Sequence, residues 1–247
     1  MDYQLTIVCI VNNQQVFDDF KVNLSKQVDV FYQLLPLYNL DNSFSGARDA
    51  YNSCIDKIIG EYVVYIHPDI RFLHDNSLKK IYDYCLKIKE FGVIGIAGCS
   101  EKLRNDKRVI YSSIFHGENQ VKAGEDIVEQ CEVQTVDECL FVMQRELIKN
   151  IKFESKKGWH LYAVEQCLRC QRRGLKNYVI PADVWHLSDG KSLNPDYVLQ
   201  LKELFVEFPE YQNINTTVRK WSNKRAKDRL FLFYYYYKQK IKRFFLR

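Results

Sequence analysis

The stretch Glu-Tyr-Val-Val-Tyr-Ile-His-Pro-Asp occupies residues 61–69 of the chain. After Glu61, residues 62–66 are apolar or aromatic and rich in β-branched side chains, which predicts a buried strand over residues 61–66. His67 and Asp69 follow the C-terminal end of that strand. In open α/β sheets, ligands bind outside these strand ends. We therefore expect the functional site at this edge of the sheet.

Strands and helices alternate on both sides of this stretch. Residues 100–130 are polar and mixed, which indicates a hairpin or an active-site loop, and the chain from Thr217 onward is expected to be helical. The alternation predicts an α/β fold with a mostly parallel sheet and helices on both of its faces. The other expected strands are 5–11, 30–37, 92–97, 136–143 and 178–180, and the expected helices are 45–59, 76–89, 145–149, 159–173 and 196–208.

Composition and charge indicate a globular protein with a distinct C-terminal segment. The 247 residues are 47% hydrophobic and 27% charged, which excludes a disordered chain. Residues 219–247 hold eleven Lys/Arg and one acid, Asp228, and therefore carry +10, whereas the preceding 218 residues carry −5. A basic segment on an acidic body predicts an anionic partner, either a membrane surface or nucleic acid.

The eight cysteines predict a reducing compartment, because most of them lie in apolar runs where free buried thiols are expected. Cys167 and Cys170 form a CxxC, but no second pair stands at zinc-site spacing, so a helical face is favoured over a metal site. The N-terminus lacks the features of a signal peptide, and no apolar run reaches the ~18 residues of a membrane span. We expect a cytoplasmic protein, either free or peripheral on the inner face of the plasma membrane.

His67, Asp69 and His186 are candidate metal ligands. Residues 67 and 69 project to the same side if the extended backbone continues past the strand. Carboxylate oxygen suits Mg²⁺ and Mn²⁺, and imidazole suits Mn²⁺ better. The alternatives are that Asp69 caps the turn after Pro68 and that His186, which follows the last expected strand, is structural.

Three carboxylates are candidates for proton transfer. Asp137 and Glu138 stand in the apolar run 136–143, where acids are unfavourable unless they are paired or face a polar cleft. A role in the functional site and a salt bridge are the two explanations that remain open for these acids. Glu165 lies on the expected helix 159–173, where a solvated helix face is the alternative.

Five segments together resemble the family 2-like glycosyltransferases of the GT-A fold, and look closest to the streptomycin-biosynthesis-type glycosyltransferase-like domains. Their order and spacing between residues 5 and 190 carry the resemblance. It implies a GT-A (nucleotide-diphospho-sugar transferase) Rossmann-like domain over residues 1–190, followed by a helical, basic and aromatic extension over residues 191–247. The segments are ARDAYN (47–52), GEYVVYIHPD (60–69), VDECLFVM (136–143), GWHLY (158–162) and VIPADVWH (179–186).

The resemblance implies transfer of a sugar from a nucleotide-sugar donor to a saccharide or lipid-linked acceptor, in the synthesis of surface polysaccharide or glycoconjugate, with Mn²⁺ or Mg²⁺ as cofactor. Asp69 matches the last aspartate of the family's DxD motif, and His67 occupies the first position. His186 matches the histidine that completes the metal or diphosphate site. The residues that would bind the nucleotide sugar are Cys9, Val11, Asn12, Arg48, Asn52, His67, Trp159 and His160.

Two positions depart from the family pattern, and the first is His67, which stands where the DxD motif begins. The family's catalytic base would stand at Ala163, which cannot accept a proton. An inverting transferase needs a carboxylate to deprotonate the acceptor, so Glu165, Asp137 and Glu138 are the candidate replacements. If none of them acts, the enzyme is retaining, or the chain is a non-catalytic module that binds a nucleotide sugar or a glycan. A membrane-associated scaffold is a third hypothesis.

Residues 229–247, RLFLFYYYYKQKIKRFFLR, mix aromatic, aliphatic and basic side chains. This pattern is typical of an interfacial helix on an anionic leaflet. The alternatives are a helix that packs on the body or forms a homodimer. Nucleic-acid binding is less favoured, because no recognised nucleic-acid module accompanies the pattern.

Overall fold

The computed structural model of the chain describes residues 3–188 and 194–245, with side chains as far as residue 241. The domain boundary predicted at residue 190 lies outside the described residues.

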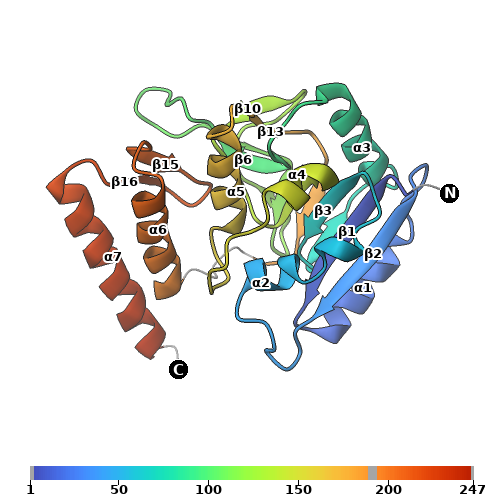
Figure 1. Ribbon diagram of the computed structural model, residues 1–247, viewed down its shortest axis with the longest axis horizontal. Coiled ribbons are helices and arrows are strands. Elements are labelled where there is room, and N and C mark those ends of the chain that lie inside the picture. Colours follow the sequence, from blue (N-terminus) through green and yellow to red (C-terminus); the bar gives the residue numbers. More distant parts are fainter. Residues whose placement is uncertain (1–2, 189–193, 246–247) are drawn as a thin grey trace.

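A seven-stranded sheet forms the centre of the molecule (Figure 1). Five of the seven strands run in one direction, while β12 and β10 run against them. The sheet is therefore mixed and mostly parallel, as the sequence predicted. Its order is β10 (Cys131–Val133), β13 (Asn177–Val179), β5 (Ile94–Gly95), β12 (Leu140–Gln144), β3 (Tyr62–Ile66), β1 (Leu5–Val11) and β2 (Tyr32–Tyr38).

Strand β3 explains why both faces of the sheet are covered. All five of its residues are buried, and alternate side chains enter two different cores. Val64 and Ile66 join the core beneath α1 (Gln14–Leu24) and α3 (Ser77–Ile88). Val63 and Tyr65 join the core beneath α2 (Ala47–Asn52), α4 (Arg145–Asn150) and α5 (Tyr162–Gln171).

Helix α1 was not predicted, although its signals are present in the sequence. The Asn13 side chain caps it by accepting a hydrogen bond from the Val16 backbone N–H at 3.1 Å. Phe17, Phe20 and Leu24 form its buried face at three- and four-residue spacing. The helix expected over residues 45–59 is shorter than predicted: α2 ends at Asn52, and only a 3₁₀ turn, η1 (Ile55–Lys57), follows.

The strand predicted over residues 136–143 is in fact two strands in two sheets. β11 (Thr135–Val136) pairs with β6 (Ala97–Cys99), which pairs with β7 (Ile110–Ser112), and β12 belongs to the main sheet. Asp137 and Glu138 stand in the break between β11 and β12. The acids interrupt the apolar run because their side chains leave the sheet for a cavity.

A four-stranded sheet lies at the C-terminal end of β3, in the order β4 (Ile70–Phe72), β14 (Val184–His186), β8 (Ile114–His116) and β9 (Val121–Lys122). Ile70 pairs with His186, and His186 pairs with His116 on its other side. This register brings the residues around 69, 116 and 186 to one place.

The sequence predicted a helix from Thr217 onward, and this prediction is wrong for the first residues of that segment. A hairpin of β15 (Asn213–Asn215) and β16 (Lys220–Ser222) follows α6 (Pro195–Glu207), and α7 (Ala226–Phe245) begins only after it. A third core joins these elements to the outer face of α5, with Leu168, Leu201 and Trp221 among its members. Figure 1 shows α6 and α7 stacked beside α5 at one side of the molecule.

All eight cysteines are free, and seven of them are buried, which agrees with the predicted free thiols. Within the described ranges, none of the helices combines the length and the apolar character that crossing a bilayer requires.

Candidate functional site

The turn between β3 and β4 carries the first part of the site. The His67 backbone N–H donates to the carbonyl of Cys139, and the Ile70 N–H donates to the carbonyl of His67. The Leu187 N–H donates to the carbonyl of Asp69 at 3.0 Å, which ties the turn to the end of β14. The turn therefore passes the chain from the main sheet to the smaller one and fixes its side chains at the junction.

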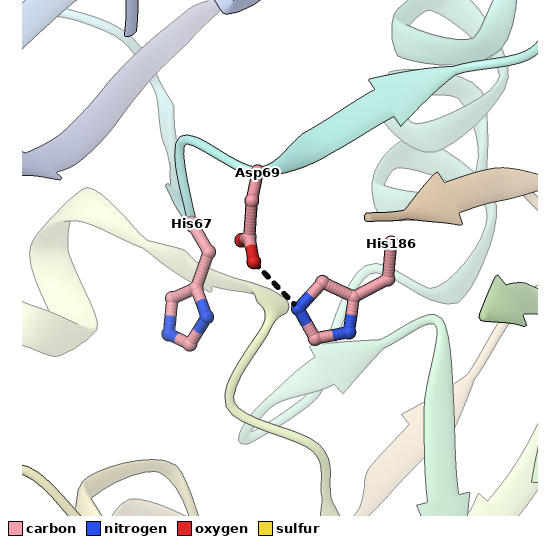
Figure 2. A group of neighbouring side chains, drawn as sticks. All are labelled: His67, Asp69 and His186. Carbon is pink, nitrogen blue, oxygen red and sulfur yellow. Dashed lines mark ion pairs between the residues drawn. The ribbon is translucent and has the colours of Figure 1, made fainter. Parts of the chain in front are cut away.

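His67, Asp69 and His186 form a cluster at this junction (Figure 2). Each offers a ligand atom, and these atoms lie within 4.8 Å of one another. Asp69 Oδ2 lies 3.2 Å from His186 Nε2. His67 Nε2 shares a 2.8 Å hydrogen bond with the hydroxyl of Tyr162. We refer to these three residues below as the His–Asp–His cluster.

The pKa values of the His–Asp–His cluster follow from burial and mutual charge. Burial alone would raise the pKa of Asp69, but the hydrogen bond and charge of His186, with the charge of His67, bring it below its usual value. Burial alone would lower the pKa of His186, but the hydrogen bond and charge of Asp69 raise it. The pKa of His67 is lowered, mainly by burial.

The His–Asp–His cluster fits a divalent cation. One carboxylate and two imidazoles are donors that Mn²⁺ accepts. The Tyr162 hydroxyl orients the second nitrogen of the His67 ring, as is usual for histidines that bind metals. The cluster therefore brings the candidate ligands at positions 67, 69 and 186 within reach of one ion.

Asp137 is held as a carboxylate at the break between β11 and β12. Its Oδ2 accepts a 2.7 Å hydrogen bond from the Thr217 hydroxyl, and its Oδ1 accepts one from the Cys139 N–H at 3.1 Å. Burial alone would raise its pKa, but these hydrogen bonds and the charge of His186 lower it. Both oxygens of Asp137 therefore already have donors.

The pKa of Glu138, in contrast to that of Asp137, is raised. Burial, with the charge of Asp137 next to it, raises its pKa to about 8. The charge of Arg48 and hydrogen bonds from the backbone N–H groups of Tyr162 and Ala163 act against that rise. Its Oε1 is buried and has no hydrogen-bond partner among the described residues. A carboxyl group of this kind takes and releases protons near neutral pH.

A cavity of about 380 Å³ brings these groups together. Asp137, Glu138 and His160 line it beside the His–Asp–His cluster, and Thr216, Thr217 and Val218 of the β15–β16 hairpin close another side. Six of the residues predicted for the site therefore share one cavity: His67, Asp69, Asp137, Glu138, His160 and His186.

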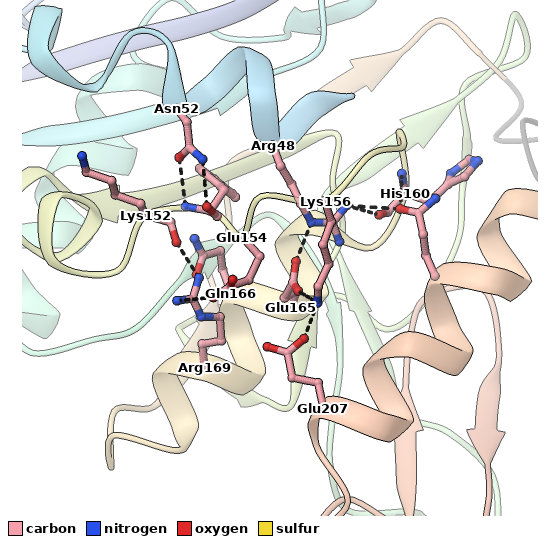
Figure 3. Close-up of polar contacts among 12 residues, drawn as sticks. Arg48, Asn52, Lys152, Glu154, Lys156, His160, Glu165, Gln166, Arg169 and Glu207 are labelled. Atoms are coloured by element: carbon pink, nitrogen blue, oxygen red, sulfur yellow. Dashed lines mark hydrogen bonds and ion pairs between the residues drawn. The ribbon is translucent and has the colours of Figure 1, made fainter. Parts of the chain in front are cut away.

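Glu165 does not line this cavity, although it was a candidate base. It is 1% exposed, and its carboxylate lies 2.5 Å from Arg48 Nε and 2.5 Å from Lys156 Nζ (Figure 3). Lys156 also pairs with Glu207 at the end of α6. This ion-pair network of Arg48, Lys156, Glu165 and Glu207 joins α2, α5 and α6. Its place in the structure favours a structural role for Glu165 over that of a base.

Arg48 and Asn52, both predicted to bind the nucleotide sugar, also use their polar groups within the fold. Arg48 Nη1 donates to the His160 carbonyl and to Gln200 Oε1, both at 3.1 Å. Asn52 exchanges two hydrogen bonds with the backbone of Phe153 (Figure 3). Neither residue is part of the cavity lining, and the contacts again favour a structural role.

The remaining predicted residues also lie outside the cavity lining. Cys9 and Val11 are fully buried in β1, Asn12 is exposed just after it, and Trp159 is 41% exposed. Burial raises the pKa of the Cys9 thiol well above its usual value, so it is not a reactive group. Asn12 and Trp159 have free surface for a ligand, and their contact with a nucleotide stays a prediction.

Sequence reasoning missed three residues of the cavity neighbourhood. His116 ends β8 and lines the cavity, with its ring centre 5.6 Å from that of His186. Tyr162 orients His67, and Thr217 orients Asp137. Tyr162 was within a quoted motif, but its partner could be found only by knowing that the N-terminus of α5 faces the β3–β4 turn. His116 was missed for the same reason, because the sequence does not show that β8 pairs with β14.

Comparisons with known proteins agree with this architecture. The model of the glycosyltransferase-like family matches residues 6–207. S. aureus TarS 1–349, solved in complex with UDP-GlcNAc, has a TM-score of 0.58 and 11% sequence identity over 83% of this chain. A second structure of S. aureus TarS gives a TM-score of 0.56 at 12% identity, again over 83% of this chain. The comparison with curated proteins found no match.

The family match covers most of the chain, so the protein belongs to the glycosyltransferase-like family. At 11–12% identity, the likeness to TarS shows the fold alone, which is GT-A. The match spans 66% of the TarS 1–349 chain and 39% of the longer TarS chain. Activity, donor and acceptor therefore have to be argued from the cavity.

Proposed function

We propose that this member of the glycosyltransferase-like family transfers a sugar from a nucleoside-diphosphate sugar to an acceptor hydroxyl in the cavity, with Glu138 as the catalytic base. One observation carries the proposal. The cavity that the His–Asp–His cluster lines is also lined by Glu138, and the backbone N–H of Ala163 lies near enough to the Glu138 carboxyl group to favour its charged form. The carboxyl group from position 138 therefore lies beside the position at which the family's base is expected.

The donor side of the cavity is the part near the His–Asp–His cluster. Mn²⁺ or Mg²⁺ held by His67, Asp69 and His186 would neutralise charge on the departing diphosphate. That TarS 1–349 was solved with UDP-GlcNAc supports a nucleotide sugar as the donor here. Asn12, exposed beyond the C-terminal end of β1, and Trp159 are the nucleotide contacts that we retain from the sequence.

The chemical step would be a single displacement at C1 of the sugar. The acceptor oxygen forms the new bond to C1 while the bond from C1 to the diphosphate oxygen breaks. The proton of the acceptor hydroxyl passes to the Glu138 carboxylate. A base with a pKa near the working pH is well matched to this transfer, and the pKa of Glu138 is about 8.

The acceptor would enter from the side of the C-terminal hairpin. A second, open hollow of about 610 Å³ shares Val218 with the cavity. Its charged lining residues are one acid and four cations: Asp106, Lys107, Arg108, Arg219 and Lys220. Four cationic side chains beside the cavity favour an acceptor that carries phosphate, such as a lipid-linked saccharide. We accordingly propose that residues 191–247 are an accessory region that completes the acceptor side of the catalytic domain, residues 1–190.

A non-catalytic nucleotide-sugar-binding module is the second candidate, and two observations favour it. Position 163 is an alanine, and a carboxyl group with a pKa of about 8 is mostly protonated at neutral pH. A protonated Glu138 cannot accept the acceptor's proton, so the two candidates differ in turnover and not in donor binding.

A thermal-shift screen with UDP, GDP, CMP and dTDP, each with and without Mn²⁺, tests both candidates. A nucleotide present at 100 times its dissociation constant stabilises the protein by about 2.7 kcal/mol, which raises the melting temperature by roughly 5–10 °C. We expect one nucleotide to give such a rise only with Mn²⁺. Sugar transfer with the corresponding nucleotide sugar then distinguishes enzyme from binding module. If no nucleotide raises the melting temperature, both candidates are wrong.

A further inference from the structure

Helix α7 has two apolar faces, of which only one packs on the protein. Leu232 is 3% exposed, and the rings of Tyr235 and Trp221 are 5.4 Å apart between centres. Arg219 lies over the ring of Phe231 at 4.3 Å. Figure 1 shows α7 outside α6, at the edge of the molecule, so its other face looks away from the body.

The outer face carries five large hydrophobic side chains, each between 43% and 68% exposed. Their spacing of three and four residues places them in one stripe, since each helical residue turns by about 100°. The same geometry puts the packed positions 232, 235 and 239 on the opposite side. The stripe consists of Leu230, Phe233, Tyr234, Tyr237 and Ile241.

Exposed basic residues flank the stripe on both sides. At 100° per residue, Lys227 and Lys238 lie along one edge, and Arg229 and Lys240 lie along the other. The acid of this helix, Asp228, is used at its N-terminus, where it accepts hydrogen bonds from the Ser222 hydroxyl and the Arg225 N–H. The outer face is therefore an apolar band between two cationic edges.

We propose that the outer face of α7 docks the protein on an anionic lipid bilayer. An apolar stripe enters the boundary between headgroups and acyl chains, and lysine and arginine at its edges reach anionic headgroups. The packing of Leu232 and Tyr235 on the body holds the helix in place before it meets the lipid, so little ordering entropy opposes binding.

Two other partners fit the outer face less well. Nucleic acid would stack on the aromatic rings, but Leu230 and Ile241, which end the stripe, have no ring to offer. A second copy docked stripe to stripe would bring two sets of cationic edges together, and like charges repel. Charge complementarity therefore favours the anionic bilayer.

Sedimentation of the full chain with vesicles tests the proposal without substrate, so its outcome is independent of the proposed activity. We expect binding to phosphatidylcholine vesicles that contain phosphatidylglycerol, and little binding to pure phosphatidylcholine vesicles. The double variants Phe233→Ser/Tyr237→Ser and Lys238→Gln/Lys240→Gln should each lower the partition coefficient at least about tenfold. Val206→Ser is the matched control, because Val206 is an 82% exposed apolar residue on α6, away from the stripe, and its loss should change nothing.

Unchanged melting temperatures would show that the variants fold. The proposal is overturned if anionic vesicles do not bind the wild type, or if neither double variant weakens binding. It is also overturned if light scattering shows a dimer that the Phe233→Ser/Tyr237→Ser variant does not form. A third contrary result is an oligonucleotide that displaces the wild type from the vesicles and that the Lys238→Gln/Lys240→Gln variant does not bind.

Discussion

Two groups of charged side chains, the ion-pair network and the cavity lining, are balanced differently. In the ion-pair network, the cations Arg48 and Lys156 match the carboxylates Glu165 and Glu207. In the cavity, Asp69, Asp137 and Glu138 lie beside histidines and neutral donors, and the described residues that line it include no lysine or arginine. A buried charge alone does not mark a functional site. We propose that carboxyl groups gathered beside histidines around a cavity do mark one.

The two groups should respond in opposite ways to removal of a carboxylate charge. In the network, the change leaves cations unpaired and should destabilise the fold. In the cavity, neutralising Glu138 removes an unfavourable buried charge, so it should stabilise the fold at a pH where Glu138 is charged, while it lowers activity. Each experiment below either sharpens this contrast or breaks it.

The largest effect is expected for Glu165→Gln. It leaves Arg48 and Lys156 without their shared carboxylate, and loss of one partner of a buried ion pair costs about 3–5 kcal/mol. The melting temperature should fall by roughly 10 °C, with little change in transfer rate per folded molecule. Glu146→Gln is the control, because the Glu146 side chain is 69% exposed and its surface pairs with Arg145 and Lys149 contribute little. A Glu165→Gln variant that is stable but inactive would restore Glu165 as a candidate base.

Glu138→Gln comes next. Loss of a general base should lower kcat at least about 100-fold, with nucleotide binding unchanged. Because Gln carries no charge at any pH, the variant should also melt at a higher temperature than the wild type above pH 8. Steady-state kinetics and thermal melts of the same preparations measure both effects. A transfer rate within threefold of wild type, an allowance of about 0.7 kcal/mol, would remove Glu138 from the mechanism.

A smaller effect is expected from pH in the unmodified protein. Burial and the charge of Asp137 raise the pKa of Glu138 to about 8, so the group is protonated and inactive below that pH and charged above it. Transfer should therefore rise about tenfold between pH 7 and pH 9.

The same raised pKa means that the folded state binds the extra proton, so the free energy of unfolding should decrease as pH rises from about 4.5 to 8. A transfer rate that does not change between pH 7 and pH 9 would contradict the assignment of Glu138 as the base.

The smallest effect is expected for Thr217→Val. It removes the 2.7 Å hydrogen bond to Asp137 Oδ2 and nearly preserves side-chain volume. Loss of such a hydrogen bond to a charged group costs about 1.5–3 kcal/mol. Water in the open cavity should offset part of this cost by binding to Asp137 in place of the hydroxyl. Transfer should fall roughly fivefold, about 1 kcal/mol, through a changed acceptor KM. An effect on donor KM alone would place the β15–β16 hairpin on the donor side.

The fold could be predicted largely because its centre is made of local signals. The run 61–66 nearly coincides with β3, and Gly174 follows the end of α5 with a φ of +78°. Errors arose where long-range contacts decide. Asp137 and Glu138 break a predicted strand because their side chains turn to a cavity, and residues 213–222 form a hairpin that packs on Tyr197 through Trp221.

The candidate site could be predicted in part. His67, Asp69 and His186 were chosen because polar residues follow strand ends, and the register of β4 with β14 brings them together. Glu165 and Glu138 could not be ranked from sequence. Only the fold shows that Arg48, 117 residues earlier in the chain, neutralises Glu165, while Glu138 lines the cavity beside the His–Asp–His cluster.

The most direct test of the cation-and-diphosphate site is electron paramagnetic resonance of Mn²⁺ titrated with the wild type and with Asp69→Asn, in the presence of the nucleotide found by thermal shift. We predict that the wild type binds one Mn²⁺ together with the nucleotide, and that Asp69→Asn, with an unchanged melting temperature in the absence of ligand, releases the ion. Equal Mn²⁺ binding by both proteins would contradict the account.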